Sequence, residues 1–136
     1  MEATEPNKPL MCRGVRGATV AETDTREAIH AAILELVIAM VQANNIDSED
    51  LASAIFTTTP DLHASFPAEA VRHMGWEFVP LLGAVEMDKY GGQDRCIRVL
   101  LHWNTTKGQR EINHIYLRGT EKLRTVGTPT NSTSGT

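Results

Sequence analysis

Apolar residues recur in the first half of the chain with the spacing of one amphipathic helix. Four of them lie three or four positions apart: Ile29, Ile33, Leu36 and Met40. This period predicts a helix that packs one face on a sheet and runs to about Asn44. Asp24 is the candidate N-cap, and Glu27 follows three residues later, as in a capping box.

Shorter runs of β-branched, aromatic and alternating apolar residues predict strands. They cover 12–20, 51–59, 77–82, 96–103 and 111–117. The run at 96–103 is the strongest, and we expect it to lie at the centre of the sheet. A short helix over 68–74 follows Pro67 and ends at Gly75.

These elements predict an α+β domain: a mixed β-sheet with one long helix and short helices. A single long helix covers only one sheet face, so we expect oligomerisation to bury the other. Residues 1–10 and 125–136 are polar, and neither segment can bury enough surface to offset its ordering entropy. We therefore expect two disordered tails around a folded domain at 11–124.

Composition narrows the function classes. The chain has 136 residues and a net charge of −4, so it has room for one domain and is a poor candidate for nucleic-acid binding. It shows no apolar run of about 20 residues, which argues against a membrane span. The first residues lack the apolar segment of a signal peptide, and the two cysteines, Cys12 and Cys96, are too few for a secreted disulfide scaffold. We expect a cytoplasmic protein with reduced thiols.

Charge is unevenly distributed along the chain. Residues 22–88 hold twelve acidic and two basic residues, whereas residues 89–124 hold eight basic and three acidic residues. The two segments either form solvated faces that complement each other across a subunit contact, or include an anion-binding site formed by strand arginines. Composition alone does not choose between these interpretations.

Arginine is the residue type with the clearest chemical signal. The glycine-rich spots match no nucleotide-binding loop, the histidines lack metal-ligand spacing, and no serine or cysteine has a nucleophile setting. We therefore expect no cofactor and no metal. Arg16 and Arg98 lie in strand-like stretches and need an anionic partner. That partner is either Glu86 or Asp88 within the chain, or a carboxylate or phosphate on a ligand. Tyr116, on the last strand, is either an additional donor or a half-buried strand residue.

Five short blocks stand in order along the chain. They read RGVRGAT at 13–19, TPDLHASFPAEAVR at 59–72, VPLLGAVEMD at 79–88, CIRVL at 96–100 and HIYL at 114–117. Together they resemble the AroH-type chorismate mutases over about 11–124. The resemblance implies a homotrimer, a pseudo α/β-barrel whose three active sites lie at subunit interfaces. It implies conversion of chorismate to prephenate by a Claisen rearrangement in phenylalanine and tyrosine biosynthesis, without a cofactor or a covalent intermediate.

The resemblance also implies roles for individual residues. The catalytic pair is Arg98, which points at the breaking ether oxygen, and Glu86, which accepts a hydrogen bond from the ring hydroxyl. The substrate-binding residues are Arg16 and Tyr116 at the enolpyruvyl carboxylate, Phe66 as an apolar wall, Arg72 near the ring carboxylate, Gly83 through its backbone N–H, and Leu123, which closes the site.

The chain departs from the family pattern at three places. Gly83 stands where one branch of the family has a cysteine, so a thiol role is excluded here. Glu69 replaces a lysine found at the mouth of the site in some members, which makes the mouth less positive. The Leu123-Arg124 pair is not followed by the usual Pro-Asp-Leu.

Overall fold

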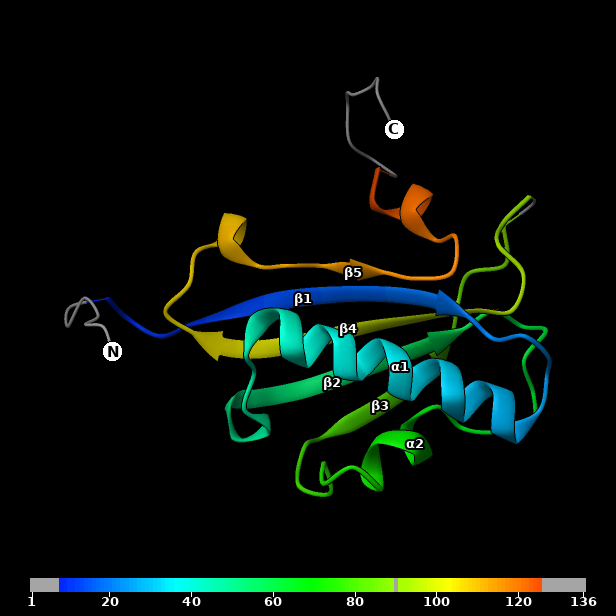
Figure 1. Ribbon diagram of the computed structural model, residues 1–136, viewed down its shortest axis with the longest axis horizontal. Coiled ribbons are helices and arrows are strands. Elements are labelled where there is room, and N and C mark those ends of the chain that lie inside the picture. The colour runs from blue at the N-terminus through cyan, green and yellow to red at the C-terminus, as the bar shows by residue number, and fades with distance from the viewer. Residues whose placement is uncertain (1–7, 90, 126–136) are drawn as a thin grey trace.

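Residues 8–89 and 91–125, which the computed structural model describes, form a five-stranded mixed sheet (Figure 1). The strands are β1 (Met11–Val20), β2 (Leu51–Thr58), β3 (Leu81–Val85), β4 (Cys96–Thr105) and β5 (Ile115–Tyr116). Their order is β3-β2-β4-β1-β5. β4 is antiparallel to both of its neighbours, and each edge strand is parallel to the strand beside it. The predicted mixed sheet and the central place of 96–103 are confirmed.

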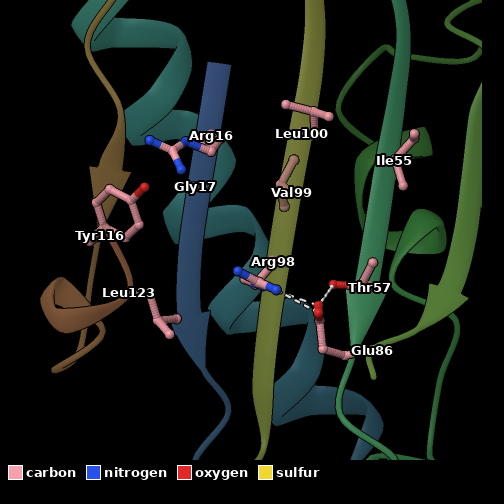
Figure 2. Close-up of a pocket in the computed structure, with 10 residues that line it drawn as sticks. All are labelled: Arg16, Gly17, Ile55, Thr57, Glu86, Arg98, Val99, Leu100, Tyr116 and Leu123. Atoms are coloured by element: carbon pink, nitrogen blue, oxygen red, sulfur yellow. Dashed lines mark hydrogen bonds and ion pairs between the residues drawn. The ribbon is translucent and has the colours of Figure 1, made fainter. Parts of the chain in front are cut away.

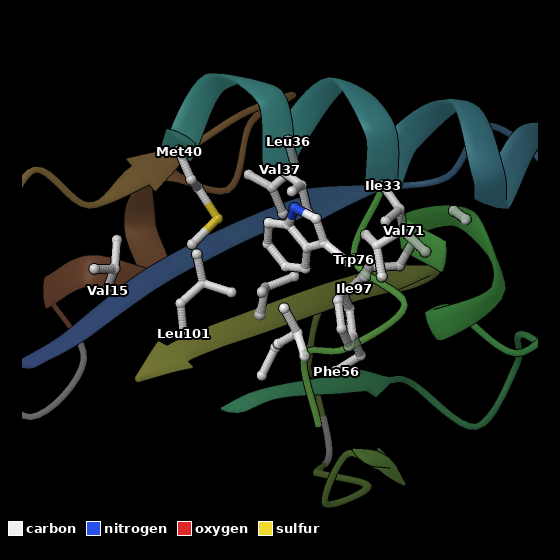
Figure 3. Close-up of a cluster of buried hydrophobic side chains, with 14 of the residues drawn as sticks. Val15, Ile33, Leu36, Val37, Met40, Phe56, Val71, Trp76, Ile97 and Leu101 are labelled. Carbon is white, nitrogen blue, oxygen red and sulfur yellow. The ribbon is translucent and has the colours of Figure 1, made fainter. Parts of the chain in front are cut away.

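One face of the sheet is covered by α1 (Arg26–Asn44), with α2 (Ala68–Arg72) packed beside it (Figure 1). Three 3₁₀ turns complete the described elements: η1 (Ser48–Asp50), η2 (Gln109–Glu111) and η3 (Glu121–Thr125). By length and composition alone, α1 could cross a membrane. Its apolar side is instead buried on the sheet, as the core around Val37 and Leu101 shows (Figure 3).

From Ile97 to Thr105, alternating burial along β4 separates the two faces. Ile97, Val99, Leu101 and Trp103 are buried on the helix side, while Arg98 and its even-numbered neighbours lie on the opposite, open face. A strand presents successive side chains to opposite faces, so the paired residues of β1 and β2 continue this division. The core therefore lies under α1, and the open face carries the less buried side chains.

The start of α1 differs from the prediction. Thr25 is the N-cap: its hydroxyl accepts a hydrogen bond from the backbone N–H of Ala28 at 3.1 Å. The Asp24 carboxylate instead accepts from the N–H groups of residues 63–64 at 2.8 and 3.0 Å, which anchors the loop before α2. The predicted cap at Asp24, with Glu27 in a capping box, is wrong because the carboxylate is used by this distant loop.

Two predicted strands have different bounds in the structure. The strand expected at 77–82 begins at Leu81 and continues to Val85, because residues 76–79 close a turn after α2. The strand expected at 111–117 pairs with β1 only at Ile115–Tyr116. Residues 109–111 form a 3₁₀ turn. The backbone N–H of Asn113 then donates to a side chain and not to a neighbouring strand.

That side chain is Asn44, at the end of α1. Its amide nitrogen donates to the carbonyl oxygens of Met40 and Asn113, both at 2.9 Å, and its oxygen accepts from the Asn113 N–H at 2.8 Å. Asn45 then ends the helix in the left-handed conformation, as the predicted end at about Asn44 requires. The buried Asn44 amide thus ties the helix to the segment that leads into β5.

The predicted disordered tails, 1–10 and 125–136, fall mostly outside the described residues. Residues 8–10 are exposed, and Thr125 is the last residue of η3. The two cysteines are free and lie at opposite ends of the β1–β4 ladder, where Cys12 pairs with Asn104 and Cys96 with Val20. Burial raises the pKa of the Cys96 thiol to about 11.

Gly17 marks the closest approach of β1 to α1, and this contact is testable. A Cβ at Gly17 would lie 2.4 Å from the Met40 sulfur and 3.1 Å from a Leu36 methyl. We expect Gly17→Ala to lower the free energy of unfolding by about 1–3 kcal/mol through overpacking, measured by urea denaturation. Gly14→Ala is the matched control on the same strand, since its Cβ would meet only a Leu100 methyl at 3.3 Å.

A double-mutant cycle locates the clash. Met40→Ala removes the side chain that the new methyl meets, so Gly17→Ala should cost less in that background. An equal cost in both backgrounds would contradict the packing described here.

Candidate active site

A pocket opens on the uncovered face, over β1, β2, β4 and β5 (Figure 2). Ten residues line it: Arg16, Gly17, Ile55, Thr57, Glu86, Arg98, Val99, Leu100, Tyr116 and Leu123. Five of them are among the residues that the sequence singled out: Arg16, Glu86, Arg98, Tyr116 and Leu123. The fold thus brings together residues as distant in the sequence as Arg16 and Leu123, which are 107 positions apart.

Arg98 lies at the centre of the pocket, on the middle strand of the sheet. Its Nε donates to Glu86 Oε1 at 3.1 Å, and its Nη2 donates to Glu86 Oε2 at 2.5 Å. Its Nη1 donates to none of the other described residues, so this nitrogen is available to a ligand. The side chains of Arg98 and Glu86 are 45% and 23% exposed, which leaves the pair reachable from solvent.

Glu86 reaches Arg98 from just beyond the end of β3. Its backbone N–H donates to the Thr58 carbonyl at 2.8 Å, so the pairing of β3 with β2 continues for one more residue. Its Oε1 also accepts from the Thr57 hydroxyl at 2.7 Å. The Arg98 hydrogen bond lowers the pKa of Glu86 most, the Thr57 bond adds to this, and burial opposes both. The same pairing raises the pKa of Arg98.

Arg16 is the second guanidinium of the pocket. It pairs across the ladder with Leu100, and Arg98 pairs with Ala18, so the two arginines are diagonal neighbours on one face. In the part of the chain that the structure describes, the Arg16 guanidinium forms no hydrogen bond or ion pair. It is an exposed cation that faces the pocket without a carboxylate partner (Figure 2).

The backbone of Arg16 is held by His114. Its N–H donates to His114 Nδ1 at 3.0 Å, which requires that nitrogen to be unprotonated. Burial and then the charge of Arg16 lower the pKa of His114. The imidazole therefore stays neutral, with its proton on Nε2, and remains an acceptor for β1.

Tyr116 and Leu123 form the wall beside β1. Tyr116 pairs in parallel register with Ala18, which places its ring on the open face next to Arg16 (Figure 2). Leu123 lies in η3. Thr120, just before η3, is hydrogen-bonded to the backbone of β1. The buried Thr120 hydroxyl lies 2.8 Å from the Leu117 carbonyl and 3.1 Å from that of Ala18.

Comparison with known proteins decides the family. Residues 12–126 match the family described as chorismate mutase type I. The chain is 51% identical over 115 residues to chorismate mutase AroH of Thermus thermophilus, which covers 84% of this chain and 94% of that protein. It is 42% identical over 116 residues to chorismate mutase AroH of Bacillus subtilis strain 168, with 85% and 91% covered.

The chain belongs to the type I chorismate mutase family. The solved structure of a chorismate mutase from Clostridium thermocellum has the same fold, with a TM-score of 0.79 and 41% identity. It covers 81% of this chain and 98% of that one. The predicted family, fold class and enzyme class are confirmed, and the place in aromatic amino acid biosynthesis follows from the enzyme.

Three of the residues expected in the active site do not line this pocket in a single chain. Phe66 is 77% exposed in the loop before α2, Arg72 is the exposed last residue of α2, and Gly83 is exposed on the edge strand β3. All three lie on the β3 side of the molecule, whereas Tyr116 and Arg16 lie on the β5 side. One chain thus presents two separate parts of the expected site.

Other pocket residues were not predicted from the sequence. Ile55 and Leu100 are cross-strand partners on the open face and give the pocket an apolar floor. Thr57 contributes the hydroxyl that Glu86 accepts. The alternation of 51–59 places Ile55 and Thr57 on one face, but their relation to Arg98 depends on the register with β4, which a single sequence does not show.

The pocket combines two guanidinium groups, one carboxylate, one phenol and an apolar floor. Such a set has the chemistry to bind an anionic ligand and to stabilise negative charge near Arg98. Among residues 8–89 and 91–125, no group of three or more His, Cys, Asp or Glu side chains is placed to hold a metal ion.

The coupling of Glu86 to Arg98 predicts a titration experiment. Because the folded pKa of Glu86 is lowered, its contribution to stability is present above the unfolded pKa and is lost as the pH falls through the folded pKa. Arg98→Ala removes the hydrogen bond that lowers the Glu86 pKa most, so Glu86 should titrate at a higher pH in this variant. Carbon-detected NMR of the Glu86 carboxyl group measures this titration. Asp24, whose pKa is lowered by His63 and Ala64, is the internal control and should not move. An unchanged Glu86 titration would contradict this coupling.

Proposed function

We propose that this pocket is the active site in which chorismate rearranges to prephenate, with Arg98 and Glu86 as the catalytic groups. The observation that carries the proposal is the Arg98–Glu86 pair, with the Nη1 of Arg98 left for a ligand, in a chain of the type I chorismate mutase family. The direct test is to mix the purified protein with chorismate and follow the loss of its ultraviolet absorbance. A chain that forms no prephenate would refute the proposal.

Arg98 acts on the breaking bond. When the ether C–O bond breaks ahead of C–C formation, negative charge develops on the ether oxygen. A fixed cation at that oxygen stabilises the transition state more than the ground state, and it needs no reorganisation during the reaction. The hydrogen bonds to Glu86 fix the orientation of the guanidinium before the negative charge develops on the ether oxygen.

Glu86 acts beside Arg98, on the ring of the substrate. Its carboxylate accepts from the ring hydroxyl of chorismate and lies on the side where positive character develops. Its lowered pKa keeps it ionised near neutral pH, as this role requires. The rearrangement transfers no proton, so neither catalytic group has to change its protonation state.

Arg16 and Tyr116 bind the enolpyruvyl carboxylate above the apolar floor of Ile55 and Leu100. Holding both ends of the substrate selects the compact chair-like conformer from a mostly extended ensemble. A millionfold acceleration requires about 8 kcal/mol. One preorganised charged donor supplies about 3–4 kcal/mol, and confinement of the reactive conformer supplies the remainder.

The second part of the site comes from another copy of the chain, in a cytoplasmic homotrimer with three interfacial sites. Phe66 provides an apolar wall, Arg72 binds the ring carboxylate and the Gly83 backbone N–H approaches the substrate hydroxyl. These residues face solvent in a single chain, and so do several apolar side chains near β3: Phe78, Leu82, Val85 and Met87, which are 61% to 88% exposed. Burial of this apolar group and completion of the pocket both favour the trimer.

Kinetics of arginine variants separate the two guanidinium roles. Arg98→Ala should lower kcat by at least about 10²–10³, by analogy with the loss of an oxyanion donor, and Arg98→Lys should show an intermediate loss. Arg16→Ala should mainly raise KM, because its carboxylate contact is made in both the ground state and the transition state. Circular dichroism controls for folding. A folded Arg98→Ala protein with near-normal kcat would exclude Arg98 as the ether-oxygen group.

Subunit mixing tests whether two chains build each site. Arg98→Ala inactivates the pocket part, and Arg72→Ala impairs the part contributed from α2. Refolding the two variants together should restore about a quarter of the wild-type activity, since random trimers contain one intact site in each mixed assembly. Each variant refolded alone is the control. If native mass spectrometry shows mixed trimers but activity does not return, each chain builds its own site.

A further inference from the structure

The backbone of Glu86 lies at the end of the sheet, where its N–H donates to the Thr58 carbonyl at 2.8 Å and the regular pairing stops. It follows the last residue of the edge strand β3, and the residues after it, 87–89, have no regular structure. The neighbouring Met87 side chain is 81% exposed. A glutamate carboxylate at the end of three rotatable bonds needs side-chain contacts to hold one position.

Thr57 is on a more rigid element than Glu86. It lies in β2, between β3 and β4, and pairs with Ala84 on one side and with Arg98 on the other. Its β-branched side chain restricts rotation about χ1, so its hydroxyl has a defined direction. That hydroxyl donates to Glu86 Oε1 at 2.7 Å, as the dashed line in Figure 2 shows.

The hydrogen bonds to the carboxylate distinguish its two oxygens. Oε1 accepts from both Thr57 and the Arg98 Nε, whereas Oε2 accepts from the Arg98 Nη2. A carboxylate offers about four lone-pair sites, so Oε2 keeps one for a further donor. If Arg98 shifts toward a bound ligand, the Thr57 hydrogen bond is the side-chain contact that still holds the Glu86 carboxylate to the central sheet.

We propose that Thr57 is a positioning residue for Glu86, whose hydroxyl fixes Oε1 and thereby presents Oε2 to the substrate hydroxyl. The proposal rests on the catalytic role proposed above for Glu86. It adds a residue that acts through Glu86 and does not itself touch the reacting atoms.

The test compares three variants on β2. Thr57→Val removes the hydroxyl at nearly constant shape and should lower kcat at least about tenfold, and up to about 100-fold, with a smaller change in KM. Thr57→Ser keeps the donor and should retain most of the activity. Thr58→Val is the matched control, because Thr58 is the next residue on the strand, faces the other side of the sheet and contacts Glu86 through its carbonyl only.

Two further measurements separate positioning from a structural effect. The thermal unfolding temperature of Thr57→Val should stay close to that of the wild type, and Glu86 should titrate at a higher pH in this variant. In a Glu86→Ala background, Thr57→Val should have little additional effect on kcat, since the group through which it acts is gone.

The outcomes distinguish this proposal from the proposed function. If wild-type protein makes no prephenate, or if Glu86→Ala keeps full activity, the role of Glu86 fails and the role of Thr57 fails with it. If Glu86→Ala is impaired but Thr57→Val has normal kcat, only the role of Thr57 is refuted. A Thr57→Val loss that is equally large with and without Glu86 would also refute it.

Discussion

Among the described residues, α1 is the one long helix, and it covers only one face of a five-stranded sheet. The rest of the structure depends on this constraint. On β4, Ile97 and Val99 are buried under the helix, and Arg98 between them faces the other way. A slip of one residue in the register would put the guanidinium in the core and an isoleucine in the pocket. The packing that stabilises the domain therefore also determines which side chains form the site.

The open face places two guanidinium groups close together, and the sheet order provides the carboxylate that one of them needs. Glu86 follows β3, and β2 alone separates β3 from β4, so its side chain spans the intervening strand to reach Arg98. The sequence left open whether the arginines serve an internal ion pair or a ligand. For Arg98 the structure shows the internal pair, with Glu86, and the same pair leaves its Nη1 without a partner among the described residues. Arg16 keeps its guanidinium free of carboxylates within the described chain.

The sequence predicted the elements whose patterns are long and repeat many times. The helix face of α1 and the alternation of β4 are such patterns, and both agree with the structure. The predictions failed where a distant polar side chain competes for the backbone. Asp24 is a residue type that favours N-cap positions, but its carboxylate accepts hydrogen bonds from the loop at 63–64. The Asn44 side chain hydrogen-bonds to the backbone of Asn113, where a longer β5 was expected.

The site shows the same division between local and tertiary information. Arg16 and Arg98 stand out by residue chemistry, since a cation in a strand needs an anion. Glu86 and Tyr116 were candidates from their residue types, but their roles, and the choice of Leu123, came through the resemblance to a known family. Thr57 gave no signal, because its partner is 29 positions away and only the register of three strands brings the two side chains together.

The wall that carries Tyr116 is attached differently from the rest of the pocket. β5 contributes two residues to the sheet, and side-chain hydrogen bonds hold the segments around it: Asn44 of α1 before it, and its own flanking residues His114 and Thr120, which bond to the backbone of β1. Opening such a segment breaks these side-chain contacts and the short β1–β5 pairing but leaves the β1–β4 ladder intact, so it costs less free energy than global unfolding. These three anchors therefore set how often the segment that carries Tyr116 opens, and a substitution at any of them changes that local equilibrium without altering the β1–β4 pairing that presents Arg98.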